Sequence, residues 1–485
     1  YKYMKNRPVV VGIGSIQQKA CFDELDEALI LMDLALKKSL KDTTNLEIKN
    51  YIDEIQIPKG YWRYRDPGKW ISKNNNIQNI TTSVAKIGVL QQNLINSTCN
   101  KIINGDIRAG IVIGGEARYK ILRAEIENKI FKETELNINP DHYIKSKDDL
   151  HLKVEEEQLG LMAVGYYAIL ESALRASSGV NFKKYHKQIA KLYSEFSKIA
   201  SKNNDSWIKS SLSFDEILNQ SNKNPIQAFP YNKYHCTSWN VNQSCSMIIC
   251  AEEVADELKI PNHKRVYPLA SSETNHMIAT LQRPNLIEPY GMKLAAEFIL
   301  EICQNNNIKP NLYDLYSCFP VAVSMFSKSL GLKNSKNLTI TGGMPFAGGP
   351  LNSYIIHSTV KMIENIRNNN KNVGVVTGVS GMMTKQSYAL WAKEPKIEFM
   401  YKDFTNEAQK KEHAIELSSL QEGVGNIIGY TTLHRTDPVK AIIYLNCEDG
   451  KRKLITSTDK SIIKSMETKE WVKRKVYFKK NQLVY

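Results

Sequence analysis

The 485-residue sequence lacks several features that would assign a protein to a class at once. Its eight cysteines form no CxxC pair and show no metal-ligand spacing, so we expect reduced thiols and no bound metal. No apolar run approaches the ~20 residues of a membrane-spanning helix, and the first residues lead into a strand-like run without a signal-peptide pattern. These absences predict a cytoplasmic protein with no membrane span.

Acidic residues are fewer than basic ones, and the formal net charge is +15. Such an excess favours acidic partners. The basic residues are dispersed, however, apart from KRK at 451–453 and at 473–475. We therefore do not expect nucleic-acid binding. A milder alternative, in which basic side chains assist a phosphate-bearing ligand, stays open.

The length of the chain predicts two or three domains. Strand-like and helix-like segments alternate in the first half, with strands at 8–15, 51–57, 109–115 and 241–250 and helices at 23–40 and 80–104. The second half repeats this order, with strands at 265–270, 312–317 and 373–376 and a helix from Pro350 to Arg367. Strand–helix–strand order in both halves predicts an α/β fold with a duplicated βαβ core.

Two regions depart from this pattern. Residues 116–230 mix charged stretches with helices and are interpreted as an insertion folded over one end of the sheet. From about residue 396 onward, short β-rich runs are separated by polar turns, which is typical of a small β-barrel. We predict an N-terminal half at 1–250, a C-terminal half at 251–395 and an additional β-rich domain at 396–485.

The loop TITGGMPFAGGPLN at 339–352 contains two glycine pairs and ends in Pro350. Glycines let a backbone approach a ligand closely, and proline suits the first position of a helix. The unpaired N–H groups of a helix start attract anions. The loop therefore predicts a binding site at a helix N-terminus. A tight strand-to-helix turn without a ligand is the alternative.

This loop resembles the Asn-Pro-x-Gly-Gly…Gly-His-Pro loop of thiolases. Gly342–Gly343 matches the first glycine pair, and Gly348-Gly349-Pro350 matches Gly-His-Pro, which places Gly349 where the catalytic histidine is expected. The resemblance covers nearly all of residues 4–395. Its other specific segments are AGIVIGGEARY (109–119), DLYSCFP (314–320) and VVTGVSGMMTK (375–385).

With its β-rich tail, the whole chain resembles the thiolase-like proteins of type 1, which carry an added C-terminal domain and are usually labelled acetyl-CoA acetyltransferases. The resemblance implies the thiolase fold, with layers in the order α-β-α-β-α. It also implies coenzyme A as ligand or cosubstrate, and lipid metabolism as the setting.

The resemblance also implies a nucleophilic cysteine at a helix N-terminus, where the helix dipole lowers the thiol pKa. Counting back from Gly105 puts this position near Lys86–Gly88, but no cysteine, serine or threonine occurs from Ala85 to Gln92. Cys99 lies too deep in the helix and is interpreted as a buried structural thiol. The strand end at 377–381, where many thiolases carry a second cysteine, has none. We infer that the classical nucleophile, acid and base are missing.

Cys318 is the remaining candidate for catalysis. The sterol-carrier-protein type of thiolase carries His-Asp-Cys-Phe where this chain has Tyr316-Ser317-Cys318-Phe319. A buried apolar cysteine is the alternative interpretation. His357 lies two turns into its helix and is expected to pack rather than react.

Two further pairs of residues are candidates for reactive groups. His235 and Cys236 are neighbours on an extended segment and should face opposite sides. Glu273 and His276 are interpreted as a satisfied surface pair, although a role as general base is conceivable.

The resemblance implies that the binding apparatus persists. Backbone N–H groups at both glycine segments could hold a thioester carbonyl as an oxyanion hole does, and Met344, Phe346 and Met382 could line a pantetheine slot. The predicted coenzyme A contacts are Phe346, Gly348, Gly349, Pro350, Asn352, Gly378, Ser380 and Gly381. The leading hypothesis is a CoA or acyl-CoA binder without classical thiolase activity. The alternatives are an acyltransferase that uses a relocated group such as Cys318, and a scaffold subunit that forms a homodimer or docks a protein through its C-terminal domain.

Overall fold

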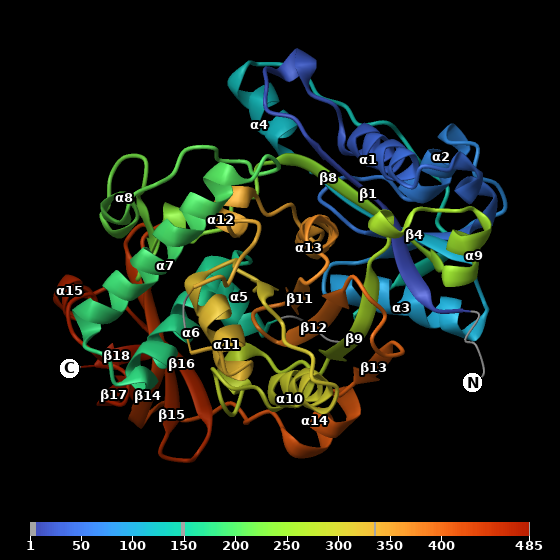
Figure 1. The fold of residues 1–485 in the computed structure, drawn as a ribbon. Helices are drawn as coiled ribbons and strands as arrows, with labels where there is room; N and C mark the ends of the chain where they lie inside the picture. Colours follow the sequence, from blue (N-terminus) through green and yellow to red (C-terminus); the bar gives the residue numbers. More distant parts are fainter. Residues whose placement is uncertain (1–5, 147–150, 334–335, 485) are drawn as a thin grey trace.

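The computed structural model describes residues 6–146, 151–333 and 336–484. Three β-sheets organise the chain, and Figure 1 shows how helices separate and cover them. Residues 147–150 of the predicted insertion lie outside the described part, as do residues 4–5 of the thiolase-like region. Within the described residues, none of the helices combines the length and the apolar composition needed to cross a bilayer.

The first sheet belongs to the N-terminal half. Its strands follow the order β1 (Pro8–Gln17), β8 (Asn242–Ala251), β4 (Ala109–Ala117), β2 (Ile52–Pro58), β3 (Thr81–Ala85) and β5 (His142–Ile144). The β1–β8 and β8–β4 pairs are antiparallel, and the remaining pairs are parallel. Strands β4 and β8 are buried along their whole length, which explains why they are almost continuously apolar or small.

The second sheet repeats this arrangement in the C-terminal half. Its strands follow the order β10 (Leu312–Asp314), β11 (Val373–Ser380), β12 (Lys385–Ala392), β9 (Tyr267–Thr274) and β13 (Met400–Asp403). Strands β10, β11, β12 and β9 follow one another as β2, β4, β8 and β1 do in the first sheet. The N–H of Leu315 donates to the carbonyl of Leu338, so the segment after helix α11 (Pro320–Ser329) lies where the first sheet has β3. The predicted duplication is therefore present in the topology.

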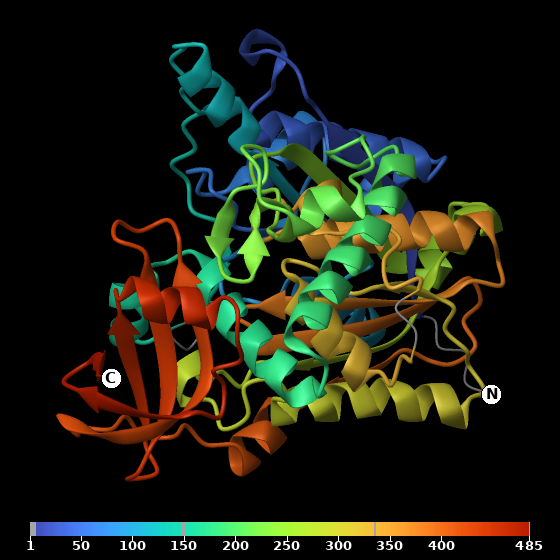
Figure 2. The ribbon, with the colours of Figure 1, turned by 90° about the vertical axis from the view of Figure 1, so that its left-hand side faces the viewer.

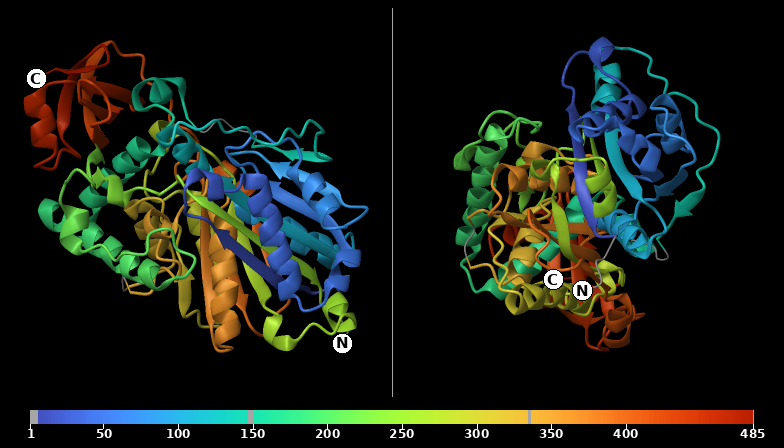
Figure 3. Two further views of the ribbon diagram at one scale, coloured as in Figure 1. Left: turned by 90° about the horizontal axis from the view of Figure 1, so that it is seen from above. Right: turned by 45° about the vertical axis from the view of Figure 1, so that its right-hand side comes forward.

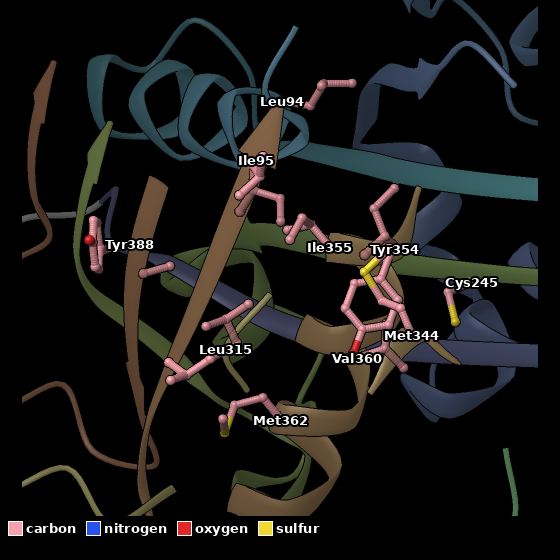
Figure 4. Close-up of a cluster of buried hydrophobic side chains, with 14 of the residues drawn as sticks. Leu94, Ile95, Cys245, Leu315, Met344, Tyr354, Ile355, Val360, Met362 and Tyr388 are labelled. Atoms are coloured by element: carbon pink, nitrogen blue, oxygen red, sulfur yellow. The ribbon is translucent and has the colours of Figure 1, made fainter. Parts of the chain in front are cut away.

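Two buried helices lie between the sheets. Helix α3 (Gln91–Asn104) contacts β4, β8 and β11, and helix α13 (Tyr354–Asn368) contacts strands of both sheets and α3 itself. Figure 4 shows Leu94 and Ile95 of α3 and Ile355 of α13 in the core between the sheets. The outer faces are covered by α1 (Ala28–Asp42) and α2 (Pro67–Asn74) on the first sheet and by α10 (Tyr290–Asn305) on the second. This order of layers confirms the predicted thiolase-type α/β fold.

The inserted region and the C-terminal region meet at one end of the molecule. The insertion supplies α5 (Lys153–Leu159), α6 (Ala163–Ser178), α7 (Phe182–Lys202) and α8 (Phe214–Leu218). The C-terminal strands β14 (Glu422–Leu433), β15 (Lys440–Cys447), β16 (Arg452–Ser457), β18 (Gln482–Val484) and β17 (Lys475–Lys479) close into a five-stranded barrel through a β14–β15 pairing. Figure 2 and the left view of Figure 3 show the barrel at one end beside these helices.

Short elements connect these parts. They are α4 (Arg118–Ile126), α9 (Glu252–Glu257), α11 (Pro320–Ser329), α12 (Met344–Ala347), α14 (Thr405–Lys411), α15 (Lys460–Met466), β6 (Ile226–Ala228) and β7 (Tyr231–Asn232). Strand β6 pairs with β14, and α6 packs on β14. The insertion thus extends the barrel sheet through β6 and packs against the barrel through α6.

Three helix starts differ from the sequence prediction. The first, expected at residue 23, lies at Ala28. The helix expected at 80–104 is a strand, β3, followed by a loop and by α3 from Gln91, because Thr81-Thr82-Ser83-Val84 favours extended backbone and joins the first sheet. The helix expected from Pro350 begins only at Tyr354. The preceding Met-Pro-Phe-Ala forms the one-turn helix α12, and Pro350 starts a separate turn.

Candidate functional site

The N-terminus of α3 is where the resemblance implies a nucleophile. The helix starts at Gln91, and its N-cap residue, Leu90, makes no side-chain capping bond. The side-chain oxygen of Gln91 instead accepts a 2.8 Å hydrogen bond from the backbone N–H of Ile355 in α13. The first turns of the two central helices are therefore joined by an amide, with no thiol or hydroxyl between Ala85 and Gln92.

A buried lysine lies at the same helix start. Lys385, the first residue of β12, places its Nζ 2.8 Å from the carbonyl of Gly88 and 2.5 Å from the hydroxyl of Ser146. Sequence reasoning did not select this residue, because the polar start of β12, Lys385-Gln386-Ser387, does not indicate a buried lysine. The ammonium group adds positive charge where the α3 dipole is already positive.

The glycine loop at 339–352 packs against α7 of the insertion at Gly342 and Gly343, and against the segment between β7 and β8 at Gly349. A Cβ atom added at Gly349 would lie 2.2 Å from Cγ2 of Thr237. The N–H of Gly349 donates to the carbonyl of Ser238 at 2.9 Å. The position at which the resemblance places the catalytic imidazole therefore has no room for any side chain, and its amide already has a protein partner.

The other predicted contacts in this loop are partly structural. Phe346 is buried and packs edge-on against Tyr193 at a ring-centroid distance of 5.9 Å. Asn352 has a left-handed backbone (φ 57°), and its Nδ2 donates to the carbonyl of Lys59 at 3.1 Å. Pro350 is buried, and its carbonyl accepts from the N–H of Ser353. The loop is thus a preformed turn joined to both halves of the fold.

The second glycine segment, Gly378–Gly381, lies at the end of β11 and in the turn that follows. Gly378 pairs with Ser387 in the sheet, and the carbonyl of Gly381 accepts from the hydroxyl of Tyr167 at 3.1 Å. The carbonyl of Ser380 accepts from the hydroxyl of Thr384. Thr377 accepts a 2.9 Å bond from the N–H of Tyr316, which ties this strand end to the segment that carries Cys318.

Cys318 lies in a tight aromatic setting. Its side chain is buried, and burial raises the pKa of its thiol to about 12. The next residue, Phe319, stacks on Tyr167 at 4.7 Å, and the carbonyl of Cys318 accepts from the hydroxyl of Thr237. A protonated thiol packed between strand and helix matches the apolar interpretation of this residue, and a catalytic role stays a prediction.

The remaining candidates separate into structural contacts. Glu273 is fully buried and accepts from Asn93, Asn96, Asn275 and Tyr401, whereas His276 Nε2 lies 2.7 Å from the carbonyl of Glu412. The prediction of a surface pair between Glu273 and His276 is therefore wrong, because strand β9 places the Glu273 carboxylate in the core. His357 does not simply pack: it faces Cys245, a thiol that sequence reasoning did not select.

Comparison with known proteins places this geometry in context. No protein-family model matches the sequence, and the search of curated proteins found no match. A monomeric SCP2-thiolase like protein type 1 from Mycobacterium smegmatis has a TM-score of 0.83 at 22% identity over 99% of both chains. The Acat5 thiolase from Ascaris suum, solved in complex with coenzyme A, has a TM-score of 0.56 at 13% identity over 80% of this chain and 100% of that one.

A third similar structure is the Ltp2-ChsH2(DUF35) aldolase, with a TM-score of 0.60 at 11% identity over 81% of this chain and 99% of that one. These likenesses show that the chain has a thiolase-like fold. The match to the type 1 protein extends over almost the whole chain, including the barrel.

Proposed function

We propose that this protein binds coenzyme A or an acyl-CoA thioester at the paired glycine segments and does not perform classical thiolysis. The fold supports binding, since a thiolase with the same core is described in complex with coenzyme A. The basic charge of the chain supports a ligand that carries phosphates. The predicted contacts remain the residues around Phe346–Asn352 and Gly378–Gly381.

The contact between Gly349 and Thr237 supports the proposed absence of classical thiolysis. An imidazole at position 349 would need the space that Thr237 fills, and the α3 start provides no sulfur or hydroxyl nucleophile. Catalytic groups of this kind act as a unit, so a site without nucleophile and base retains little of the rate. A ligand carbonyl would have to compete with Ser238 for the Gly349 amide.

Isothermal titration with coenzyme A, acetyl-CoA and pantetheine tests the binding proposal on the full chain. We expect heat and thermal stabilisation with both CoA compounds, and weaker binding of pantetheine, which lacks the nucleotide phosphates. At a free ligand concentration of a hundred times the Kd, the folded state gains about 2.7 kcal/mol. Neither heat nor stabilisation with any of the three compounds would end the proposal.

Two matched variants locate the site. Asn352 and Asn307 both have a positive φ, so replacement by glycine keeps either backbone conformation. Asn352→Gly removes a side chain from the predicted ligand loop and should weaken CoA binding by roughly two- to tenfold, the size of one hydrogen bond. Asn307→Gly, in the turn after α10, should leave the Kd unchanged. Equal effects of the two variants would place the ligand elsewhere.

We further propose that any partner docks at the C-terminal barrel. Strand β5 of the same chain pairs with the outer edge of β3, so a second copy cannot pair directly with β3. A structural neighbour that combines two named components, the Ltp2-ChsH2(DUF35) aldolase, supports a hetero-partner. Light scattering after size exclusion should give the monomer mass; twice that mass would favour a homodimer.

A further inference from the structure

A thiol–imidazole pair lies in a cavity beside the glycine loop. A cavity of about 30 Å³ opens between strand β8, helix α13 and the segment after α7. Figure 4 shows Cys245 of β8 beside the side chains of Met344, Tyr354 and Val360. Gly348 of the glycine loop also lines the cavity, so the site adjoins the glycine segment that is proposed to bind the thioester.

Two residues distant in the sequence form a pair in this cavity. The Sγ atom of Cys245 lies 3.0 Å from Nδ1 of His357. Strand β8 presents Cys245 between its sheet partners Ser15 and Gly114, and α13 presents His357 one turn after Tyr354. A thiol that donates to Nδ1 leaves the ring proton on Nε2.

The cavity also contains polar atoms that have no partner. Nε2 of His357 and Oε1 of Gln243 are both buried and make no hydrogen bond within the described part of the chain. Both residues line the cavity, and only 3% of Gln243 is exposed. Unsatisfied buried groups are costly, and one donor and one acceptor beside a thiol are suited to a small polar guest.

The charged groups around the pair are few. Asp205 and Lys361 form the rim, with Lys361 Nζ 3.5 Å from Asp205 and 3.0 Å from Glu364. Burial lowers the pKa of His357 to about 4, against an opposing effect of Asp205, and burial raises the pKa of the Cys245 thiol. Both members are therefore neutral near pH 7, which is the state in which an imidazole can act as a general base.

We propose that Cys245 is an acyl acceptor and that His357 is its general base. The sulfur attacks the carbonyl carbon of a thioester while Nδ1 takes the thiol proton. A new sulfur–carbon bond forms, the sulfur–carbon bond of the donor breaks, and the leaving thiolate recovers the proton from His357. The cavity volume limits the acyl group to one of acetyl size, and entry requires the Asp205–Lys361 rim to part. Only the identity of the donor as a CoA ester rests on the function proposed above.

Peptide mass mapping of the full chain tests this site with two donors, acetyl-CoA and p-nitrophenyl acetate. The second donor contains no coenzyme A, so its result is independent of CoA binding. We expect an acetyl group on Cys245 from p-nitrophenyl acetate in the native protein and in the control Cys318→Ser. His357→Asn keeps an acceptor near the Nδ1 position but cannot take up the proton, and it should slow acetylation on the order of 100-fold.

The pH dependence of the acetylation rate of the native protein provides a second readout, which does not depend on whether a variant folds. With a neutral thiol and a base whose pKa is about 4, the rate should be nearly constant from about pH 5 to 8. An unassisted thiolate would instead react about tenfold faster per pH unit over this range. That rise, an unmodified Cys245 with both donors, or acetylation of His357→Asn at the native rate would each overturn the proposal. Acetylation by the ester together with no CoA binding would support the pair while refuting the proposed function.

Discussion

Gln91 and Ile355 join the two halves of the fold at their centre. The side-chain oxygen of Gln91, in the first turn of α3, accepts from the backbone N–H of Ile355, in the first turn of α13. The first N–H groups of a helix have no partner within the helix, so this amide replaces a capping residue that α13 lacks. The contact also occupies the α13 helix start, where the sequence predicted an open anion site.

Replacement of this glutamine should therefore destabilise the whole core. Gln91→Ala leaves the N–H of Ile355 buried and unpaired, which costs about 1–3 kcal/mol in the free energy of unfolding. Gln92→Ala is the control, because Gln92 is similarly buried and, within the described residues, its side chain donates to the side chain of Asn96 and caps no helix. Urea unfolding measures both. A loss no larger for Gln91→Ala than for Gln92→Ala would show that the cross-helix cap contributes nothing of its own.

A second prediction concerns the close contact between Gly349 and Thr237 and its effect on stability. The backbone of Gly349 is not left-handed, so Gly349→Ala introduces strain through its methyl group, 2.2 Å from Cγ2 of Thr237. Overpacking of this kind costs about 1–3 kcal/mol. Thr237→Ser deletes the opposing methyl while keeping the hydroxyl that donates to Cys318, and it should recover part of the loss in the double variant. Strictly additive effects in urea unfolding would contradict a direct contact.

Local sequence patterns predicted the layers but not the helix starts. The apolar strands at 109–115 and 241–250, the repeated order of elements and the β-rich end all have local signals, and the structure contains each of them. Helices α3 and α13 begin later than predicted because Leu90 and Ser353, their N-cap residues, make no side-chain capping bond. Without a capping residue, periodicity alone extends a helix into the preceding strand or loop.

Contacts between distant residues had no signal in the sequence. Lys385 reaches the carbonyl of Gly88 from 297 positions away, and Cys245 meets His357 from 112 positions away. Such pairs arise only once both sheets have packed on the central helices. The same is true of Thr237, which fills the space beside position 349 from the segment between β7 and β8. The candidate site could thus be located from the glycine motif, but the distant residues that contact it could not be predicted.

The buried carboxyl of Glu171 predicts an unusual dependence of stability on pH. Burial raises its pKa to about 7, even though Tyr185 and Tyr231 donate hydrogen bonds to it. The folded state therefore holds a proton that the unfolded chain releases near its ordinary pKa of 4.5. The resulting stabilisation is complete below about pH 4.5 and is lost as the pH rises through 7, a change on the order of 3 kcal/mol.

Glu171→Gln removes this titration while keeping the shape of the side chain. Its unfolding free energy should change less between pH 5 and 8 than that of the native protein. Urea unfolding at the two pH values measures the difference. Glu216→Gln is the control, since the carboxyl of Glu216 is exposed and its pKa is lowered rather than raised. Parallel pH profiles for the native protein and Glu171→Gln would contradict a raised pKa.

The junction between the insertion and the barrel depends on Arg175. Its side chain is fully buried; Nε lies 2.8 Å and Nη2 2.9 Å from the carboxylate of Glu470, and Nη2 also donates to the hydroxyl of Tyr430 in β14. Arg175 is buried, but a third of the Glu470 side chain is exposed. Loss of the carboxylate should therefore cost more than the ~1 kcal/mol of a surface pair and less than the ~3–5 kcal/mol of a fully buried one. We therefore expect Glu470→Gln to loosen the barrel from α6 and to expose the segment near residue 396 to protease.

Glu422→Gln is the matched control for this effect. Glu422 also belongs to the barrel, but its contact with Lys479 spans 4.0 Å between two exposed side chains, so its loss should cost less than about 1 kcal/mol. Limited proteolysis followed by mass spectrometry distinguishes the two variants. Faster cleavage before β14 in Glu470→Gln alone would identify Arg175 as the residue that holds the barrel in place. Equal cleavage rates would mean that the β6–β14 pairing and the packing of α6 suffice without the ion pair, because those contacts are unchanged in both variants.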